Sequence, residues 1–255
     1  MALHKLEALV VVAASTYGWT VDSGTQRYLT AGNYLWSGAS GMAAATTLAA
    51  HFQTQLRLDV ANTTVAISNT TGLMTITWGS GSRSLQWTNT AWRVICGFTG
   101  NLAAATSATS PRQCQHLWLP NVQAGALYSS THGRGRRSSD LKIVRAKSGK
   151  VFARGSGNLP TEGQWRFFGL SRAKTWRESE STQYESAEFF WENALALGRP
   201  FRFYSDATDA TSGFTPIDAV YRDYYANAPE FAPTEVRSNT DVSWTWEFPA
   251  YLYVA

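Results

Sequence analysis

The chain has 255 residues, of which 44% are hydrophobic and only 16% are charged, and its formal net charge is +4. This length suits one large domain or two ordinary ones. The mild positive charge does not by itself indicate nucleic-acid binding. The two cysteines, Cys96 and Cys114, argue against a disulfide framework and a structural zinc site, and they predict free thiols in a reducing cytoplasm. No apolar run approaches the roughly 20 residues of a membrane-spanning helix.

The low charge and the aromatic content, with 11 Trp, 11 Tyr and 12 Phe, predict extensive burial. Charged residues make up about 25% of a typical soluble protein, so this chain relies little on charge for solubility. Three interpretations stay open: a Trp-rich β core, a surface that is covered by partners, and a surface whose aromatic residues stack on sugars. The short apolar run 9–14 fits a first strand or an interface arm better than a signal peptide.

Residues 1–130 predict an α+β interface domain, with helices packed on a small antiparallel sheet. An extended segment, 27–35, leads to a helix over 43–58, which Ser37 or Ser40 caps. Alternating apolar residues then predict a three-stranded meander, which turns at 69–72 and at 79–82. A short helix over 91–96 follows, capped by Thr88, Asn89 or Thr90, and Gly97 supplies its left-handed end.

Residues 131–140 predict a Gly/Ser/Arg linker, because apolar periodicity vanishes there. It contains Arg134, Arg136 and Arg137. Three roles for these arginines stay open. They neutralise phosphates, they lie against an acidic groove of a neighbouring subunit, or they belong to a solvated linker.

Residues 141–255 predict a mostly-β domain, a β-sandwich or barrel-like unit with one amphipathic helix. A strand is expected at 164–171. A capping box at 182–185 then starts a helix that buries the stripe Ala187, Phe190, Trp191, Ala194 and Leu195. Gly198 and Pro200 end this helix, and a strand follows at 201–204. Alternating Trp residues predict a last strand from 242 to 254, in which Pro249 breaks the ladder or marks an edge.

Groups that could do chemistry are few, and each has a structural explanation. His51 fits a helix surface and His116 an apolar strand, while His4 and His132 lie in irregular segments. Glu178 and Glu180 lie before the predicted helix, and Glu185, Glu188 and Glu192 fit its solvated face. Asp206 and Asp209 fit a polar hairpin loop and do not match a calcium loop. Metalloprotease, nucleophile-elbow and P-loop patterns do not occur. We therefore expect a protein that is not an enzyme and that uses no cofactor or metal.

The segment ESAEFFWENALALGRPFRFYSD, residues 185–206, resembles the distal tail proteins of long-tailed bacteriophages. In that family an amphipathic helix leads through a Gly-Arg/Lys-x-Phe motif into an aromatic strand. VSWTWEF at 242–248 is similar to a late strand of the family. LAAHFQTQL at 48–56 and WRVICGFTG at 92–100 are similar to another phage-associated pattern. Family members usually begin with the β-sandwich unit, whereas here the interface domain precedes it.

The resemblance implies a structural subunit of the tail tip or baseplate, assembled in the bacterial cytoplasm and carried in the virion. It implies a homo-oligomer, commonly a hexameric ring, that contacts tube, hub and fibre proteins, and no membrane or nucleic acid. The residues expected at such interfaces are Trp191, Arg199 and Phe201, with the three linker arginines. A carbohydrate-binding or receptor-binding module, a head–tail connector that touches DNA, and a glycosidase stay as alternatives.

Overall fold

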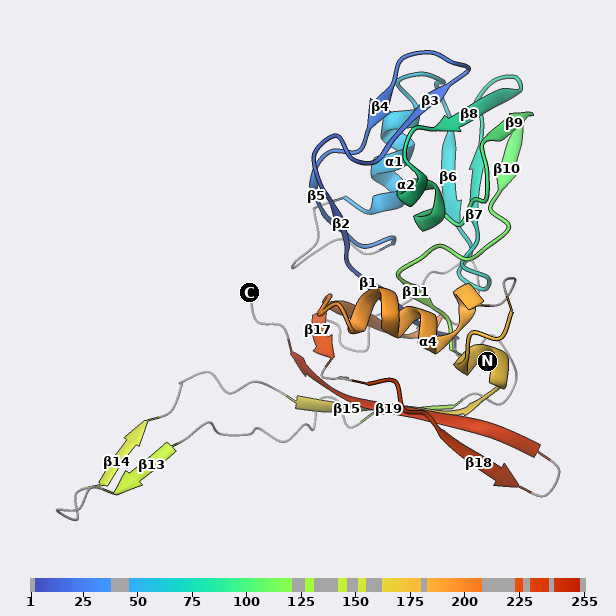
Figure 1. Cartoon of the computed structure of the whole chain (residues 1–255). Helices are drawn as coiled ribbons and strands as arrows, with labels where there is room; N and C mark the ends of the chain where they lie inside the picture. The colour runs from blue at the N-terminus through green and yellow to red at the C-terminus, as the bar shows by residue number, and fades with distance from the viewer. Residues whose placement is uncertain are drawn as a thin grey trace.

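The computed structural model describes residues 3–37, 46–120, 127–130, 142–145, 151–154, 162–179, 183–207, 223–226, 230–238 and 241–252. Within these ranges the fold is α+β, as the sequence predicts, with short helices and several antiparallel sheets. Figure 1 shows an N-terminal unit above a large sheet, with helix α4 between them.

The N-terminal unit holds three small sheets and two helices. Strands β2 (Val10–Val12) and β5 (Gly32–Tyr34) form a pair. A four-stranded sheet has the order β4 (Arg27–Tyr28), β3 (Gly18–Val21), β8 (Arg83–Trp87), β9 (Leu102–Ala105). A three-stranded sheet has the order β10 (Ser107–Thr109), β7 (Met74–Thr77), β6 (Thr64–Ile67). The helices are α1 (Leu48–Leu56) and α2 (Thr90–Ile95).

Local sequence signals explain both helices. Helix α1 begins at Thr47, whose side chain accepts a hydrogen bond from the amide of Ala50 at 3.1 Å. The sequence placed the cap earlier, at Ser37 or Ser40, which the cap at Thr47 corrects. Ser37 hydrogen-bonds to Lys5 and Glu7 instead, and Ser40 lies outside the described ranges. Helix α2 is capped by Asn89, one of the three predicted residues. Gly97 follows with φ of +81°, which confirms the expected left-handed end.

The first hydrophobic core joins these elements. Helix α1 buries Leu48, Phe52 and Leu56, which share one face at i, i+4 and i+8. The predicted three-stranded meander is corrected: its first two strands pair as β6 and β7, but its third strand, β8, belongs to the four-stranded sheet. Strand β7 and the residue after it bury Met74, Ile76 and Trp78, the alternation expected of a strand with one covered face. The rings of Trp19 and Trp92 meet Phe52 edge to face at 4.7 and 5.2 Å, so aromatic contacts tie α1 and α2 to the four-stranded sheet.

The large sheet has eight strands and draws on both ends of the chain. Its path runs β11 (Leu117–Trp118), β1 (Leu3–Ala8), β16 (Phe201–Ala207), β17 (Asp223–Ala226), β19 (Asp241–Leu252), β15 (Glu162–Leu170), β12 (Leu127–Ser130), and β18 (Thr234–Ser238) pairs with β19. Every pair is antiparallel.

Contacts between distant strands indicate that the large sheet curls around a second core. Trp165 on β15 meets Phe203 on β16 at 4.6 Å, although β17 and β19 separate these strands. Trp118 on β11 meets Phe167 on β15 at 4.9 Å. Two ends of the path therefore face each other, as in the barrel-like unit that the sequence predicts.

The helical segment that covers this core is less regular than the sequence indicates. A 3-10 turn (Gln183–Glu185) precedes α4 (Ala187–Phe190), which continues as a π-helical turn (Trp191–Leu195). The observed cap is Ser186, which accepts from the amide of Phe189 at 3.2 Å. Phe190, Ala194 and Leu195 are buried as predicted, and Gly198 has φ of +65°. A short helix not foreseen from the sequence, α3 (Arg172–Thr175), lies between β15 and this segment.

Pro249 lies inside a continuous strand, at a break in the pairing along one edge of that strand, as the sequence predicts. It pairs with Gln164 of β15, and β19 continues to Leu252. On its other edge, β19 pairs with β18 at residues 241–245 and with β17 at residues 250–252. Pro249 falls between these two stretches, where a residue without an N–H costs the ladder least.

The two cores divide the chain differently from the predicted boundary. The first core spans Val10 to Leu117, whereas the second contains Leu6, Ala8 and Trp118 together with residues beyond 160. The N-terminal unit is therefore inserted between β1 and β11 of the large sheet. The predicted linker, 131–140, lies outside the described residues. Strands β13 (Lys142–Arg145) and β14 (Val151–Arg154) pair with each other and with no other described strand.

Candidate functional site: the junction between the two cores

Strands β1 and β11 form the wall between the two cores. Leu117 packs in the first core and the next residue, Trp118, in the second, because successive side chains of a strand point to opposite faces. Main-chain hydrogen bonds continue the junction. The amide of Ala8 donates to the carbonyl of His116 at 2.9 Å, and that of Leu9 donates to Pro200 at 3.0 Å.

A buried ion pair lies on the face of β1 toward the N-terminal unit. Lys5 Nζ is 2.6 Å from Glu7 Oε1, and the two side chains are 4% and 0% exposed. Ser37 hydrogen-bonds to both charged groups, and the Tyr204 hydroxyl donates to Glu7 Oε2 at 3.2 Å. The ammonium also lies 4.4 Å from the centre of the Tyr204 ring.

Burial alone would raise the pKa of Glu7, but Lys5 and Ser37 outweigh it and the net pKa is lowered. Burial lowers the pKa of Lys5, an effect that the Glu7 carboxylate opposes. Burial raises the pKa of Tyr204, and the nearby Glu7 carboxylate adds to this. Glu7 thus stays charged with three partners, an arrangement that fixes geometry rather than holding a proton ready for transfer.

The pocket beside this ion pair is small. Its lining includes Lys5, Glu7 and Ser37 from one side and Ser68, Asn69 and Gly72 from the turn between β6 and β7. It has room for about a single water molecule. Small-molecule sites typically enclose about 300–1,000 Å³, so this pocket does not fit an organic substrate.

His116 and Arg199 lie at the junction next to the end of β1, where they contact Ala8 and Leu9. His116 is 5% exposed and has φ of +64°, and burial followed by the charge of Arg199 lowers its pKa to about 3. Arg199 Nη1 donates to the carbonyl of Leu9 at 3.0 Å. The sequence placed His116 in a strand, whereas it lies in the turn before β11. Its lowered pKa keeps the imidazole neutral at physiological pH.

The two cysteines are buried and free, as predicted. Cys114 Sγ donates to the carbonyl of Cys96 at 3.7 Å, so the two residues lie close together. Burial raises the pKa of both thiols, and for Cys96 the neighbouring Cys114 raises it further. Thiols that stay protonated are poor nucleophiles and poor metal ligands.

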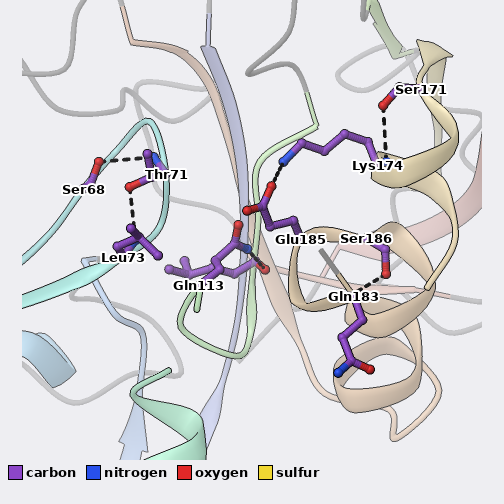
Figure 2. Close-up of polar contacts among 10 residues, drawn as sticks. Ser68, Thr71, Leu73, Gln113, Ser171, Lys174, Gln183, Glu185 and Ser186 are labelled. Atoms are coloured by element: carbon purple, nitrogen blue, oxygen red, sulfur yellow. Dashed lines mark hydrogen bonds and ion pairs between the residues drawn. The ribbon is translucent and has the colours of Figure 1, made fainter. Parts of the chain in front are cut away.

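The described carboxylates around α3 and α4 are partly or fully exposed, as expected of a solvated helix face, and they bind neighbouring Lys and Arg residues. Figure 2 shows Lys174 reaching Glu185, with Nζ and Oε2 2.6 Å apart. Arg177 binds Glu188 through its amide and Glu192 through its guanidinium. Such pairs position the helices.

A further contact joins the units at Arg112. Its Nη1 atom donates to the Tyr184 hydroxyl at 2.7 Å, and its guanidinium lies 4.6 Å from the centre of that ring. Gln113, also drawn in Figure 2, donates to the carbonyl of Leu117 at 2.7 Å. The segment before β11 is therefore fastened both to its own strand and to the helical turn before α4.

The predicted interface residues have different positions. Arg134, Arg136 and Arg137 lie outside the described residues. Arg199 is half-buried at the junction within the chain. Phe201 is 0% exposed and packs against Trp165 and Phe248 in the second core. Its assignment to an interface is corrected, because a side chain enclosed by its own core has no surface to offer a partner.

Trp191 belongs to a half-buried aromatic cluster that the sequence did not reveal. Phe231 lies 6.1 Å from Trp191 and 5.2 Å from Trp176, and Trp176 lies 5.5 Å from Trp244. These four residues, hereafter the aromatic cluster, come from four separate segments. The alternating Trp residues of the last strand were the available signal, but their neighbours become visible only in three dimensions.

Comparison with known proteins gives no assignment: no protein-family model, curated protein or solved structure matches this chain. Within the described ranges, no three His, Cys, Asp or Glu residues gather as metal ligands would. In the same ranges, no helix is both long and apolar enough to span a bilayer.

Proposed function

We propose that this protein is a structural subunit of a bacteriophage tail tip or baseplate. Copies form a ring, of which a hexamer is the expected form, that joins the tail tube to tip or receptor-binding proteins. The observation that carries the proposal is the segment 185–206 that resembles distal tail proteins. In this chain it forms α4 and β16, which build the second core and one central strand of the curled sheet.

The state of the reactive groups supports an architectural role. The buried ion pair, His116 and the two thiols are held in internal contacts. The pKa values of Glu7, His116 and both thiols move away from those that suit proton transfer or nucleophilic attack near neutral pH. This applies to Glu7, which stays charged, and to His116, which stays neutral. A site for chemistry requires groups that face a substrate, and these face the chain itself.

The surface of the large sheet supports assembly. Strand β18 is exposed along its whole length, and Trp244 of the aromatic cluster lies beside it on β19, opposite Glu235. Half-buried aromatic residues are enriched in the centres of protein interfaces. A head-to-tail contact between different surfaces of identical subunits closes a ring when its rotation angle divides the full circle.

The purified chain tests this proposal through the mass of its assembly. Light scattering coupled to size-exclusion chromatography, with negative-stain imaging, should detect closed rings of defined order. Immunogold labelling of virions should place the protein at the tail tip. A chain that stays monomeric throughout the concentration range and never purifies with virions would refute the proposal.

The alternative of a carbohydrate-binding module loses the feature that motivated it. All 11 Trp residues lie within the described ranges, seven are buried and the other four, at 87, 176, 191 and 244, are only partly accessible. Sugar-stacking platforms need exposed ring faces. The aromatic surplus therefore fits the two cores, and a glycan array that shows binding abolished by Trp191→Ala would reverse this judgement.

A further inference from the structure

Strand β18 presents an open edge at the periphery of the large sheet. All five of its residues, Thr234 to Ser238, are exposed, and within the described part of the chain it pairs with β19 alone. Figure 1 shows this hairpin extending beyond α4 on the side opposite to β17. An exposed edge strand is a ready template for another strand, and proteins usually block such edges when they stay monomeric.

The sequence of β18, TEVRS, is complementary to itself when two copies run antiparallel. If two strands meet with Val236 opposite Val236 of the second copy, each Glu235 faces an Arg237. Each Thr234 then faces a Ser238. Opposite charges directly across an antiparallel pair stabilise it, by about 0.2–1 kcal/mol for each pair.

We propose that β18 is a two-fold docking edge that pairs with β18 of a second copy of this chain and joins the two large sheets edge to edge. Within one chain Arg237 already pairs with Glu235, two residues away on the same face. In the paired state both groups keep opposite charges beside them and gain the cross-strand partner. The main chain gains the hydrogen bonds that an open edge lacks.

Apolar contacts beside the edge add to this docking surface. Val236 is 45% exposed and would pack against its own symmetry mate, while Val242 on β19, 55% exposed, lies opposite Arg237 in the hairpin. Trp244 of the aromatic cluster pairs with Glu235, so its side chain shares one face of the sheet with Glu235, Arg237 and Val242, whereas Val236 lies on the other face. Burial of these side chains supplies the non-directional part of the binding free energy.

The contact is distinct from a ring contact. A two-fold interface uses the same patch on both copies, whereas ring closure uses two different patches. Five-residue strands bury less than the roughly 1,200–2,000 Å² of a stable interface, so the pairing should depend on concentration. The inference does not require the proposed function, because either contact can form without the other.

Charge reversal at Glu235 or at Arg237, which face each other across the two paired strands, tests the proposal. In Arg237→Glu, Glu235 faces a glutamate of the second copy at both positions, and in Glu235→Arg, arginine faces arginine. Each variant alone should lose at least tenfold in two-fold association by sedimentation velocity across a concentration series. An equimolar mixture should recover it, because every cross-strand position then holds one Glu and one Arg.

Arg83→Glu is the matched control, since Arg83 is another exposed arginine in an ion pair on a strand, here with Asp22 on the N-terminal unit. It should associate as the parent does. Unchanged association of both reversed variants, a mixture that fails to recover, or a parent without two-fold association would overturn the proposal. Ring mass, measured on the same variants, reports on the proposed function separately and should not change.

Discussion

Acidification should destabilise this protein chiefly through His116, whose pKa is lowered further than that of the half-buried His51. Burial of the His116 imidazole, followed by the charge of the nearby Arg199, lowers its pKa from 6.5 to about 3. In the unfolded chain the ring is solvated and takes up a proton as the pH falls through 6.5. The folded chain does not take up that proton until about pH 3. The stability is therefore fully present above pH 6.5 and is lost progressively as the pH falls toward 3.

The magnitude follows from proton linkage. Between pH 7 and pH 5 the unfolded state gains nearly one proton that the folded state does not bind, which lowers the free energy of unfolding by about 2 kcal/mol. A loss of this size is a large fraction of the roughly 5–15 kcal/mol of a typical domain. Most carboxylates titrate below this interval, so the histidine dominates it.

Urea denaturation at pH 7 and at pH 5 measures this loss, and His116→Asn tests its source. Asparagine tolerates the left-handed backbone at this position and does not titrate. The variant should lose most of the difference between the two pH values, whereas His51→Gln, on a half-buried histidine of α1, should retain it. Equal pH dependence in His116→Asn and the parent, or an imidazole that titrates near 6.5 by NMR in the folded protein, would refute the reasoning.

Three further substitutions test the structure by urea denaturation. Lys5→Met should cost about 3–5 kcal/mol, because it leaves Glu7 charged and buried without its partner, and a second change, Glu7→Leu, should recover much of the loss. Gly97→Ala should cost more than Gly81→Ala. Both have positive φ, but a methyl group at Gly97 would lie 2.1 Å from a backbone oxygen and one at Gly81 meets open space. Asn89→Ala removes the cap of α2 and should cost about 0.5–2 kcal/mol. If Lys5→Met costs as much as the double variant with Glu7→Leu, the argument from the buried charge is contradicted. If Gly97→Ala costs as much as Gly81→Ala, the argument from the close backbone contact is contradicted.

Local patterns predicted the elements well wherever one covered face determines them. The alternation of Met74, Ile76 and Trp78 and the left-handed Gly97 are statements about neighbouring residues, and the structure confirms them. The capping box at 182–185 was less successful. Ser186 caps α4 instead, and the helix changes to a π-helical turn at Trp191, because packing on the second core decides the local hydrogen-bond pattern.

By itself the sequence determined the α+β class and the buried positions of the helix before Gly198, since each depends on residue types and short spacings. Only the tertiary structure decided that β1 joins the last strands of the chain and that the first unit is inserted between β1 and β11. It alone brought Lys5, Glu7 and Ser37 together with Tyr204. Contacts between residues 30 to nearly 200 positions apart depend on which strands pair, and strand pairing is selected by the burial of whole faces, which no local window of sequence contains.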